Sequence, residues 1–233
     1  MEKDIVLGKQ EVVAPIPISV ATKIQELFES NSPWRQYIEK NGIDVQEYRR
    51  MLEDYYVEGR RCVRIRNPEK NKVDVTEELK KLFPTMEVHP LFSDLILLPR
   101  QCKINTTPPY VQGKIVGIEA SSAMVTRTLD LTSCNLALDL CCSPGAKLLY
   151  IADVTNGRVI GNDISEARAR VCKRAMERYG HGGVKVVVGD GTKLATEWKK
   201  VAGEESRPDR VIADVECTHE GSLKHIVKFL EGK

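Results

Sequence analysis

The sequence predicts an α/β protein, with a parallel sheet in its carboxyl-terminal half and a smaller α/β module before it. From about residue 118, four apolar strand-like runs alternate with helical segments, which is the pattern of a parallel sheet buried on both faces. Residues 44–98 show a shorter succession of helix, strand, helix and strand. Prolines and glycines gather in residues 99–117, which we expect to connect the two parts.

We expect three parts along the chain: an amino-terminal extension over residues 1–43, a small α/β module with its connector over 44–117, and a sheet domain over 118–233. In the extension, apolar residues at helical spacing predict a helix from Val20 to Ser30. The module is predicted to hold a helix of about 45–56 capped by Asp44, a strand over 60–66, a polar turn over 67–71, a helix over 76–83 and a strand over 95–98.

In the sheet domain, strands are predicted over 136–140, 158–161, 184–188 and 210–213. Helices are predicted over 119–129, up to Ala152, over 165–179 with Ser165 as the cap, and over about 194–202. An acidic residue stands at or just past the end of each strand: Asp139, Asp163, Asp190 and Asp214. Sheets of this kind bind ligands at the carboxyl ends of their strands. The four acids therefore predict a ligand site, although such carboxylates also cap helices.

The turn after the first of these strands has the composition of a ligand-binding loop. Residues 141–147 read C-C-S-P-G-A-K, and their small side chains and glycine let the backbone approach a ligand at a helix start. The sequence matches neither the dinucleotide fingerprint nor the phosphate-binding loop. Asp163 follows the glycine by roughly 20 residues, where an acid can accept hydrogen bonds from ribose hydroxyls. Asp190 is placed for an adenine edge.

Four arginines lie within the seven residues 60–66. In a strand, Arg64 and Arg66 share one face, and Val63 and Ile65 share the other. The arginine face is either an ordinary solvated face or a stripe that contacts phosphates, and charge patterning alone does not decide between these alternatives.

These motifs together resemble a known family. Residues 139–147, D-L-C-C-S-P-G-A-K, resemble the D-x-C-A-A-P-G-G-K-T motif of the Sun-domain RNA cytosine carbon-5 methyltransferases. Asp163 with Arg168 resembles the family's second motif, residues 189–191 resemble its third, and residues 214–217 resemble its D-x-P-C motif. The resemblance runs from about residue 60 to the end, and residues 64–67 resemble the R-x-N motif of the family's RNA-binding region.

The resemblance implies a Rossmann-like domain that binds S-adenosylmethionine and methylates carbon-5 of cytosine in RNA, either tRNA or rRNA. The implied cofactor-binding residues are Cys142, Ser143, Pro144, Gly145, Ala146, Lys147, Asp163, Arg168, Asp190 and Asp214. The implied catalytic residues are Asp214, which holds the cytosine edge, and Cys217, which assists product release. The module before the domain is implied to be RNA-binding, through Arg61, Arg64 and Arg66.

The sequence departs from the family pattern in ways that affect the expected activity. Ala146 replaces the second glycine, and Glu216 stands where the family has proline. No T-C-S motif, which carries the family's attacking cysteine, follows Cys217. We therefore expect the first four strands only, in a fragment, a truncated isoform or a subunit completed by a partner chain, which binds cofactor but methylates RNA slowly or not at all. A substitute nucleophile at Cys217 and a non-catalytic cofactor- or RNA-binding relative stay open as alternatives.

Composition bounds the other function classes. Net charge is only +2, so bulk charge does not indicate nucleic-acid binding. No apolar run approaches the roughly 20 residues that span a bilayer, so we expect no membrane association. Seven scattered cysteines are typical of reduced thiols in a cytoplasmic or nuclear compartment. We expect no metal site, because the spacing of Cys217, His219 and His225 fits no standard zinc site. A methyltransferase of small molecules or proteins remains a third alternative, which predicts no RNA contact from residues 60–66.

Overall fold

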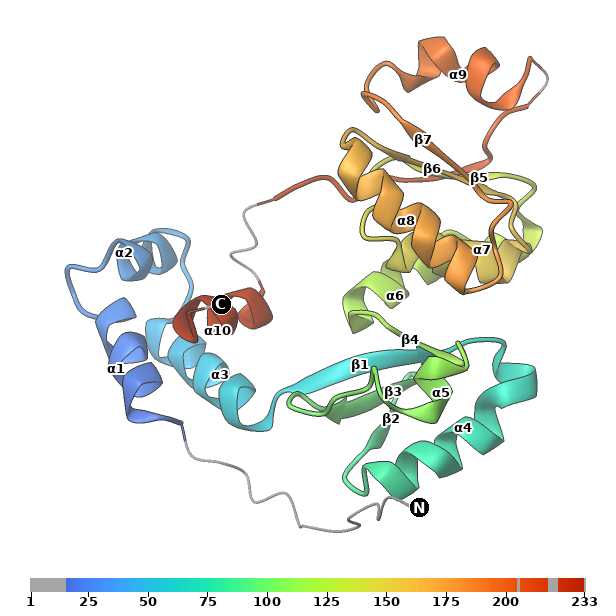
Figure 1. The fold of residues 1–233 in the computed structure, drawn as a ribbon. Coiled ribbons are helices and arrows are strands. Elements are labelled where there is room, and N and C mark those ends of the chain that lie inside the picture. Colours follow the sequence, from blue (N-terminus) through green and yellow to red (C-terminus); the bar gives the residue numbers. More distant parts are fainter. Residues whose placement is uncertain (1–15, 205, 218–221, 233) are drawn as a thin grey trace. The chain divides into compact units, whose positions relative to one another are not determined.

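The computed structural model describes residues 16–204, 206–217 and 222–232 (Figure 1). The chain forms two compact units. The first comprises Met1–Arg60, Pro99–Gln101 and Cys217–Lys233, and the second comprises Arg61–Leu98 and Cys102–Glu216. Residues 1–15 of the predicted extension lie outside the described residues. The predicted division of the chain into three parts, with limits after residues 43 and 117, stays a prediction.

The first unit is helical. It contains α1 (Ile18–Leu27), α2 (Pro33–Lys40), α3 (Val45–Glu58) and α10 (Leu223–Leu230). The predicted helices near 20–30 and 45–56 are present as α1 and α3. Asp44 caps α3 as expected, because its carboxylate accepts the Glu47 N–H at 2.7 Å. Apolar side chains of α1, α3 and α10, among them Ile24, Leu52 and Val227, form the core of this unit.

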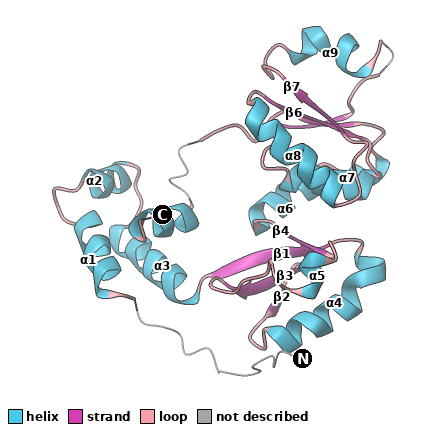
Figure 2. Ribbon diagram, in the orientation of Figure 1, coloured by secondary structure: helices cyan, strands magenta, loops and turns pink. Residues whose placement is uncertain are grey.

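The second unit begins with a four-stranded sheet in the order β2 (Glu87–His89), β3 (Phe92–Pro99), β1 (Arg60–Ile65) and β4 (Ile115–Gly117). Figure 2 shows these strands with α4 (Pro68–Leu82) and α5 (Pro108–Val111). The predicted connector thus supplies α5 and the edge strand β4, which pairs antiparallel with β1.

The helix predicted from Thr76 is wrong at its start. Residue 68 is proline, which fits the first turn of a helix, and Asn67 supplies the left-handed conformation (φ 47°) at the entry. The polar segment 67–71 is therefore the beginning of α4 rather than a turn.

The sheet domain follows, with β5 (Ala137–Asp139), β6 (Val159–Asp163), β7 (Lys185–Val188) and β8 (Arg210–Ile212) in the order β7-β6-β5-β8. All three strand pairs are parallel, which confirms the predicted architecture. The other elements are α6 (Ala120–Arg127), a 3₁₀ turn (Leu131–Ser133), α7 (Ala146–Thr155), α8 (Glu166–Arg178) and α9 (Leu194–Ala202). No helix of the described residues is long and apolar enough to cross a membrane.

Alternating side chains give the sheet two buried faces. Ala137 and Val159 pack with α7 and α8 in one core, whereas Leu138 and Ile160 pack with α9 in another. Gly161 lets α7 lie close to β6: a Cβ there would meet Leu148 Cδ2 at 2.8 Å. This packing fixes the start of α7, and with it the turn that carries the candidate site.

Candidate functional site

The turn between β5 and α7 forms a concave pocket at the carboxyl end of the sheet. Gly145 stands at the entry of α7 with φ 104°, a conformation that L side chains rarely adopt. The peptide bond between Ser143 and Pro144 is cis. The pocket is lined by Asp139, Cys141, Cys142, Ser143, Pro144, Gly145, Ala146, Lys147 and Asp214. The structure therefore brings the predicted turn residues together with Asp214, which follows the neighbouring strand β8.

Asp139 lines this pocket and is almost fully buried. Burial raises the pKa of its carboxyl to about 7, against the Cys141 N–H and Lys147, which lower it. Two neighbouring carboxylates, Asp214 and Asp163, raise it further. Any cation that enters the pocket stabilises the ionised form of this carboxyl and so lowers its pKa.

Lys147 and Asp214 form an ion pair across the pocket. Lys147 Nζ lies 2.5 Å from Asp214 Oδ2, with the carboxylate side chain more than half exposed. The lysine comes from the first turn of α7, and the aspartate follows β8 by two residues. Because the Asp214 carboxylate is exposed to solvent, this pair adds little to stability, and a ligand can redirect that carboxylate at small free-energy cost.

Asp163 is buried at the end of β6 and joins two turns. Its carboxylate accepts the Ser165 N–H at 3.0 Å and the Ser143 N–H at 3.3 Å, and Arg168 Nε lies 3.5 Å away. Ser165 Oγ in turn accepts the Arg168 N–H and caps α8, as predicted. Asp163 and Arg168 thus lie against the pocket turn rather than in the pocket lining itself. Their predicted contact with a ligand stays a prediction.

Asp190 lies outside the pocket lining and makes a local turn. Its Oδ1 accepts both the N–H and the hydroxyl of Thr192, at 3.0 and 2.7 Å. These hydrogen bonds, with Lys193 nearby, lower the pKa of the exposed Asp190 carboxyl. The alternative role of Asp190, in which its carboxylate caps the segment that follows, is therefore filled by Oδ1.

Cys217, the other predicted catalytic residue, is exposed and belongs to the first unit, directly after the exposed Glu216. Its predicted chemistry stays a prediction. Of the three residues weighed as zinc ligands, Cys217 and His225 are among the described residues, whereas His219 lies outside them. Groups of metal-ligating side chains are absent from the described part of the chain.

The arginine stripe of β1 requires a correction. Arg64 is 2% exposed and Arg66 is 8% exposed, so neither belongs to a solvated face or to a surface that can reach phosphates. Arg61 is half-buried, and its Nη1 donates to the Cys102 carbonyl. The assignment of Arg64 and Arg66 to an RNA-binding stripe is therefore wrong, because their guanidinium groups already have partners inside the second unit.

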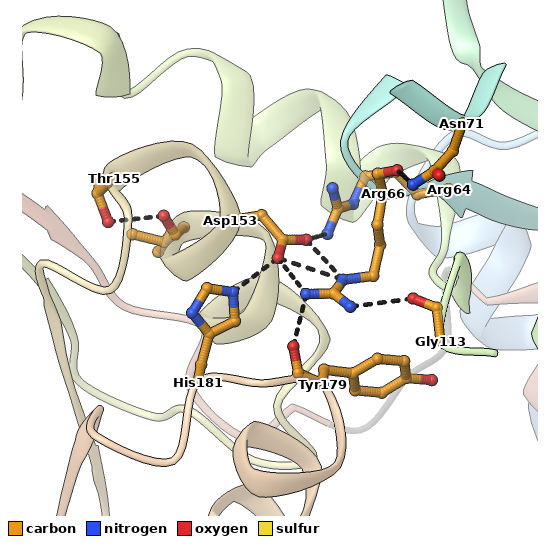
Figure 3. Close-up of polar contacts among 9 residues, drawn as sticks. Arg64, Arg66, Asn71, Gly113, Asp153, Thr155, Tyr179 and His181 are labelled. Atoms are coloured by element: carbon orange, nitrogen blue, oxygen red, sulfur yellow. Dashed lines mark hydrogen bonds and ion pairs between the residues drawn. The ribbon is translucent and has the colours of Figure 1, made fainter. Parts of the chain in front are cut away.

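Those partners converge on Asp153, which comes from α7 (Figure 3). Arg66 binds it with Nη2–Oδ1 at 2.6 Å and Nε–Oδ2 at 3.0 Å, and Arg64 contacts the same carboxylate. His181 Nε2 lies 2.8 Å from Asp153 Oδ1. Burial by itself raises the pKa of Asp153, but the bonds from Arg66 and Arg64 outweigh it and hold the pKa below its usual range. The cluster ties β1 of the small sheet to the helix that begins at the pocket.

The sequence predicted Asp139 and Cys141 as parts of the strand-end ligand site, but neither was among the implied cofactor-binding residues, and both line the pocket. One residue at these strand ends was missed altogether. Asn162, in β6, contacts both neighbouring strand ends through its side chain. The signal that could have found it is a primary amide directly before the strand-end acid Asp163.

Comparisons with known proteins show which sequences this chain is similar to. Residues 126–228 match the family model described as 16S rRNA methyltransferase RsmB/F. Ribosomal RNA small subunit methyltransferase B of Yersinia pestis bv. Antiqua (strain Angola) is 28% identical over 163 residues, which cover 70% of this chain and 37% of that protein. The chain spans about a third of the length of the curated relatives that it matches.

Solved structures share the fold. The crystal structure of PH0851 aligns with a TM-score of 0.72 at 21% identity, over 91% of this chain and 47% of that one. NSun6 from Pyrococcus horikoshii, solved with SFG, aligns with a TM-score of 0.61 at 13% identity, over 87% of this chain and 71% of that one. The Rossmann-like fold is therefore established for this chain. The family that the motifs indicated is also the one whose model matches residues 126–228, described as 16S rRNA methyltransferase RsmB/F.

Proposed function

We propose that this chain binds S-adenosylmethionine in the pocket between β5 and α7 and takes part in methylating carbon-5 of cytosine in RNA. The observation that carries the proposal is the lining of the pocket. Small residues, Ser143 to Ala146, lie at a helix start between two carboxylates, Asp139 and Asp214. The family match of residues 126–228 supports the same activity.

The chemistry of the lining fits this cofactor. S-adenosylmethionine carries a sulfonium and an ammonium group, and carboxylates in a partly desolvated pocket attract both. Asp139 and Asp214 are the candidate partners for the cationic half, while Asp163, beside the same turn, is the candidate acceptor for the ribose hydroxyls. The cofactor, when bound, supplies the methyl group. The chain's own residues bind and orient it.

The proposed RNA chemistry rests on the family motif at residues 214–217. Carbon-5 of cytosine is a poor nucleophile in the intact ring, so the family first adds a thiolate to carbon-6. In this scheme Asp214 holds the edge of the base, and Cys217 assists release of the product. Lys147 Nζ lies 2.5 Å from Asp214 Oδ2 and keeps that carboxylate oriented until the base takes the place of the lysine as its partner.

A second function, cofactor or RNA binding without turnover, is favoured by one observation. Glu216 occupies the position of the family's proline, directly before Cys217. Transfer of a tritiated methyl group from S-adenosylmethionine to total RNA distinguishes the two functions. Transfer that Cys217→Ala changes supports a catalytic chain. Saturable cofactor binding with no transfer supports the binding function, and absence of cofactor binding contradicts both.

The partner and the compartment are proposals as well. We infer an RNA partner, tRNA or rRNA, and a cytoplasmic or nuclear location from the family-level function. A partner chain that extends the sheet is supported by β8, whose outer side is unpaired within the described residues. Val211 of this strand is 47% exposed. Light scattering after size-exclusion chromatography, with and without RNA, measures whether a larger assembly forms.

A further inference from the structure

The side-chain amide of Asn162 connects three neighbouring strand ends. Asn162 lies in β6, one residue before Asp163, and is 1% exposed. Its Nδ2 donates to the Leu140 carbonyl beyond β5 and to the Gly189 carbonyl beyond β7, both at 3.0 Å. The two contacts continue the sheet past its last paired residues, into the loops on either side of β6.

These two contacts require a primary amide. Two carbonyl oxygens face the same nitrogen, so the group between them must donate two hydrogen bonds. A carboxylate at this position would only accept and would repel both carbonyls, and a hydroxyl would satisfy only one of them. The orientation of the amide is fixed by the same argument, because Oδ1 cannot face a carbonyl oxygen.

The oxygen of the same amide is an exception to the rule that buried polar atoms form hydrogen bonds. Asn162 Oδ1 is buried and has no hydrogen-bond partner among the described residues. Buried polar groups without partners are rare and destabilising, by about 1–3 kcal/mol. An apolar residue would avoid that cost but would lose the bridge. The buried amide therefore combines an unpaired oxygen, which destabilises the fold, with two hydrogen bonds that hold the loops.

The loops in question flank the proposed cofactor site. The loop after β5 leads into the pocket lining, and the loop after β7 carries the segment Gly189 to Gly191. Asn162 also binds the first loop through its backbone, because its carbonyl accepts the Cys142 N–H at 2.8 Å. Beside it, the Asp163 carbonyl accepts the Gly189 N–H at 3.1 Å.

We propose that Asn162 is a positioning residue that holds the loop after β7 in register with the pocket turn, so that the adenosine half of the cofactor meets a preformed surface. This inference rests on the proposed binding of S-adenosylmethionine at the same pocket. Asn162 touches no ligand itself and acts through the two loops that it bridges. Preorganised loops bind more tightly because less order must be created on binding.

The test uses the full chain with three variants. Asn162→Leu removes both donors at similar volume. Thr155→Val is the matched control, since Thr155 is buried and donates its hydroxyl to the Ile151 carbonyl at the far end of α7. Calorimetry measures the dissociation constants of S-adenosylmethionine and adenosine at a temperature where circular dichroism shows each variant to be folded. We expect Asn162→Leu to weaken both ligands by roughly tenfold or more, the loss of about two net hydrogen bonds, with the control within about twofold of wild type.

The third variant, Asn162→Asp, gives a readout that a purely structural role does not. The introduced carboxyl can donate one hydrogen bond while protonated, and it repels both carbonyls when ionised. Its affinity for S-adenosylmethionine, divided by that of wild type at each pH, should therefore rise as pH falls. Division by wild type removes the titration of Asp139, which both proteins share.

The outcomes separate the inference from the proposed function. If wild type binds and Asn162→Leu binds equally well, the positioning role is overturned while the cofactor site stands. Equal weakening by Thr155→Val overturns it as well, because the effect would then follow stability. Absence of binding by wild type overturns the cofactor site and the role assigned to Asn162 in it. Hydrogen exchange then still reports on the bridge: slower or unchanged exchange at residues 189–191 in Asn162→Leu excludes it without any ligand.

Discussion

Replacing Asp153 with asparagine tests whether the buried arginines of β1 support the fold. The change keeps the size of the side chain but removes the only carboxylate that Arg64 and Arg66 share in the described residues. Both guanidinium groups lie at or below one-tenth exposure, so they would remain buried with their charges uncompensated. Breaking a buried pair in this way typically destabilises a protein by about 3–5 kcal/mol. Most of that penalty is the desolvation of charges that lose their partner.

The assay must report on the second unit alone. The chain has two tryptophans, and Trp198 lies in α9 of that unit. A Trp34→Phe background therefore lets fluorescence in urea follow the second unit, and Glu166→Gln is the matched control. Glu166 pairs with Arg170 on the surface of α8, with both side chains more than half exposed, so its loss should change stability by at most about 1 kcal/mol. Equal losses in Asp153→Asn and Glu166→Gln would refute the structural role of the cluster. Arg64→Ala and Arg66→Ala should likewise reduce stability.

Two further predictions concern the pocket. Burial raises the folded-state pKa of Asp139 to about 7, above its value in the unfolded chain, so the folded protein holds an extra proton between about pH 4 and 7. Stability from this group should therefore fall as pH rises through that window, and thermal melts of Asp139→Asn at pH 5 and 8 should lack this part of the decline; an unchanged slope would contradict the assignment. Gly161→Ala should destabilise by about 1–3 kcal/mol, because its Cβ would meet Leu148 Cδ2 at 2.8 Å. Gly183→Ala, whose Cβ would meet nothing within 4 Å, should be close to neutral in the same urea titration.

The sheet domain could be predicted from sequence because its strands are apolar runs that alternate with helical segments. The start of α8 could be predicted as well, because the Ser165 hydroxyl caps this helix where the sequence indicated a cap. The strand-end position of Asp139, Asp163 and Asp214 also follows from topology alone, since parallel strands all end at one rim.

What could not be predicted depends on contacts distant in sequence. Arg64 and Arg66 look like a charged surface until Asp153, 89 and 87 residues away, is placed against them. The bridging role of Asn162 is hidden for the same reason, because its two acceptors are backbone carbonyls of other strands. Local rules did contain the answer for α4: proline at residue 68 favours the first turn of a helix over a polar turn.

Calorimetric titration of the wild-type chain with S-adenosylmethionine tests the central claim most directly. The account predicts saturable binding at one site, displaced by S-adenosylhomocysteine and weakened in Asp163→Ala by about 1.5–3 kcal/mol, the typical contribution of charge-assisted hydrogen bonds. Circular dichroism must show that this variant is folded, because Asp163 also binds the Ser143 and Ser165 N–H groups. Absence of saturable binding, or binding that is unchanged in the folded Asp163→Ala variant, would contradict the account.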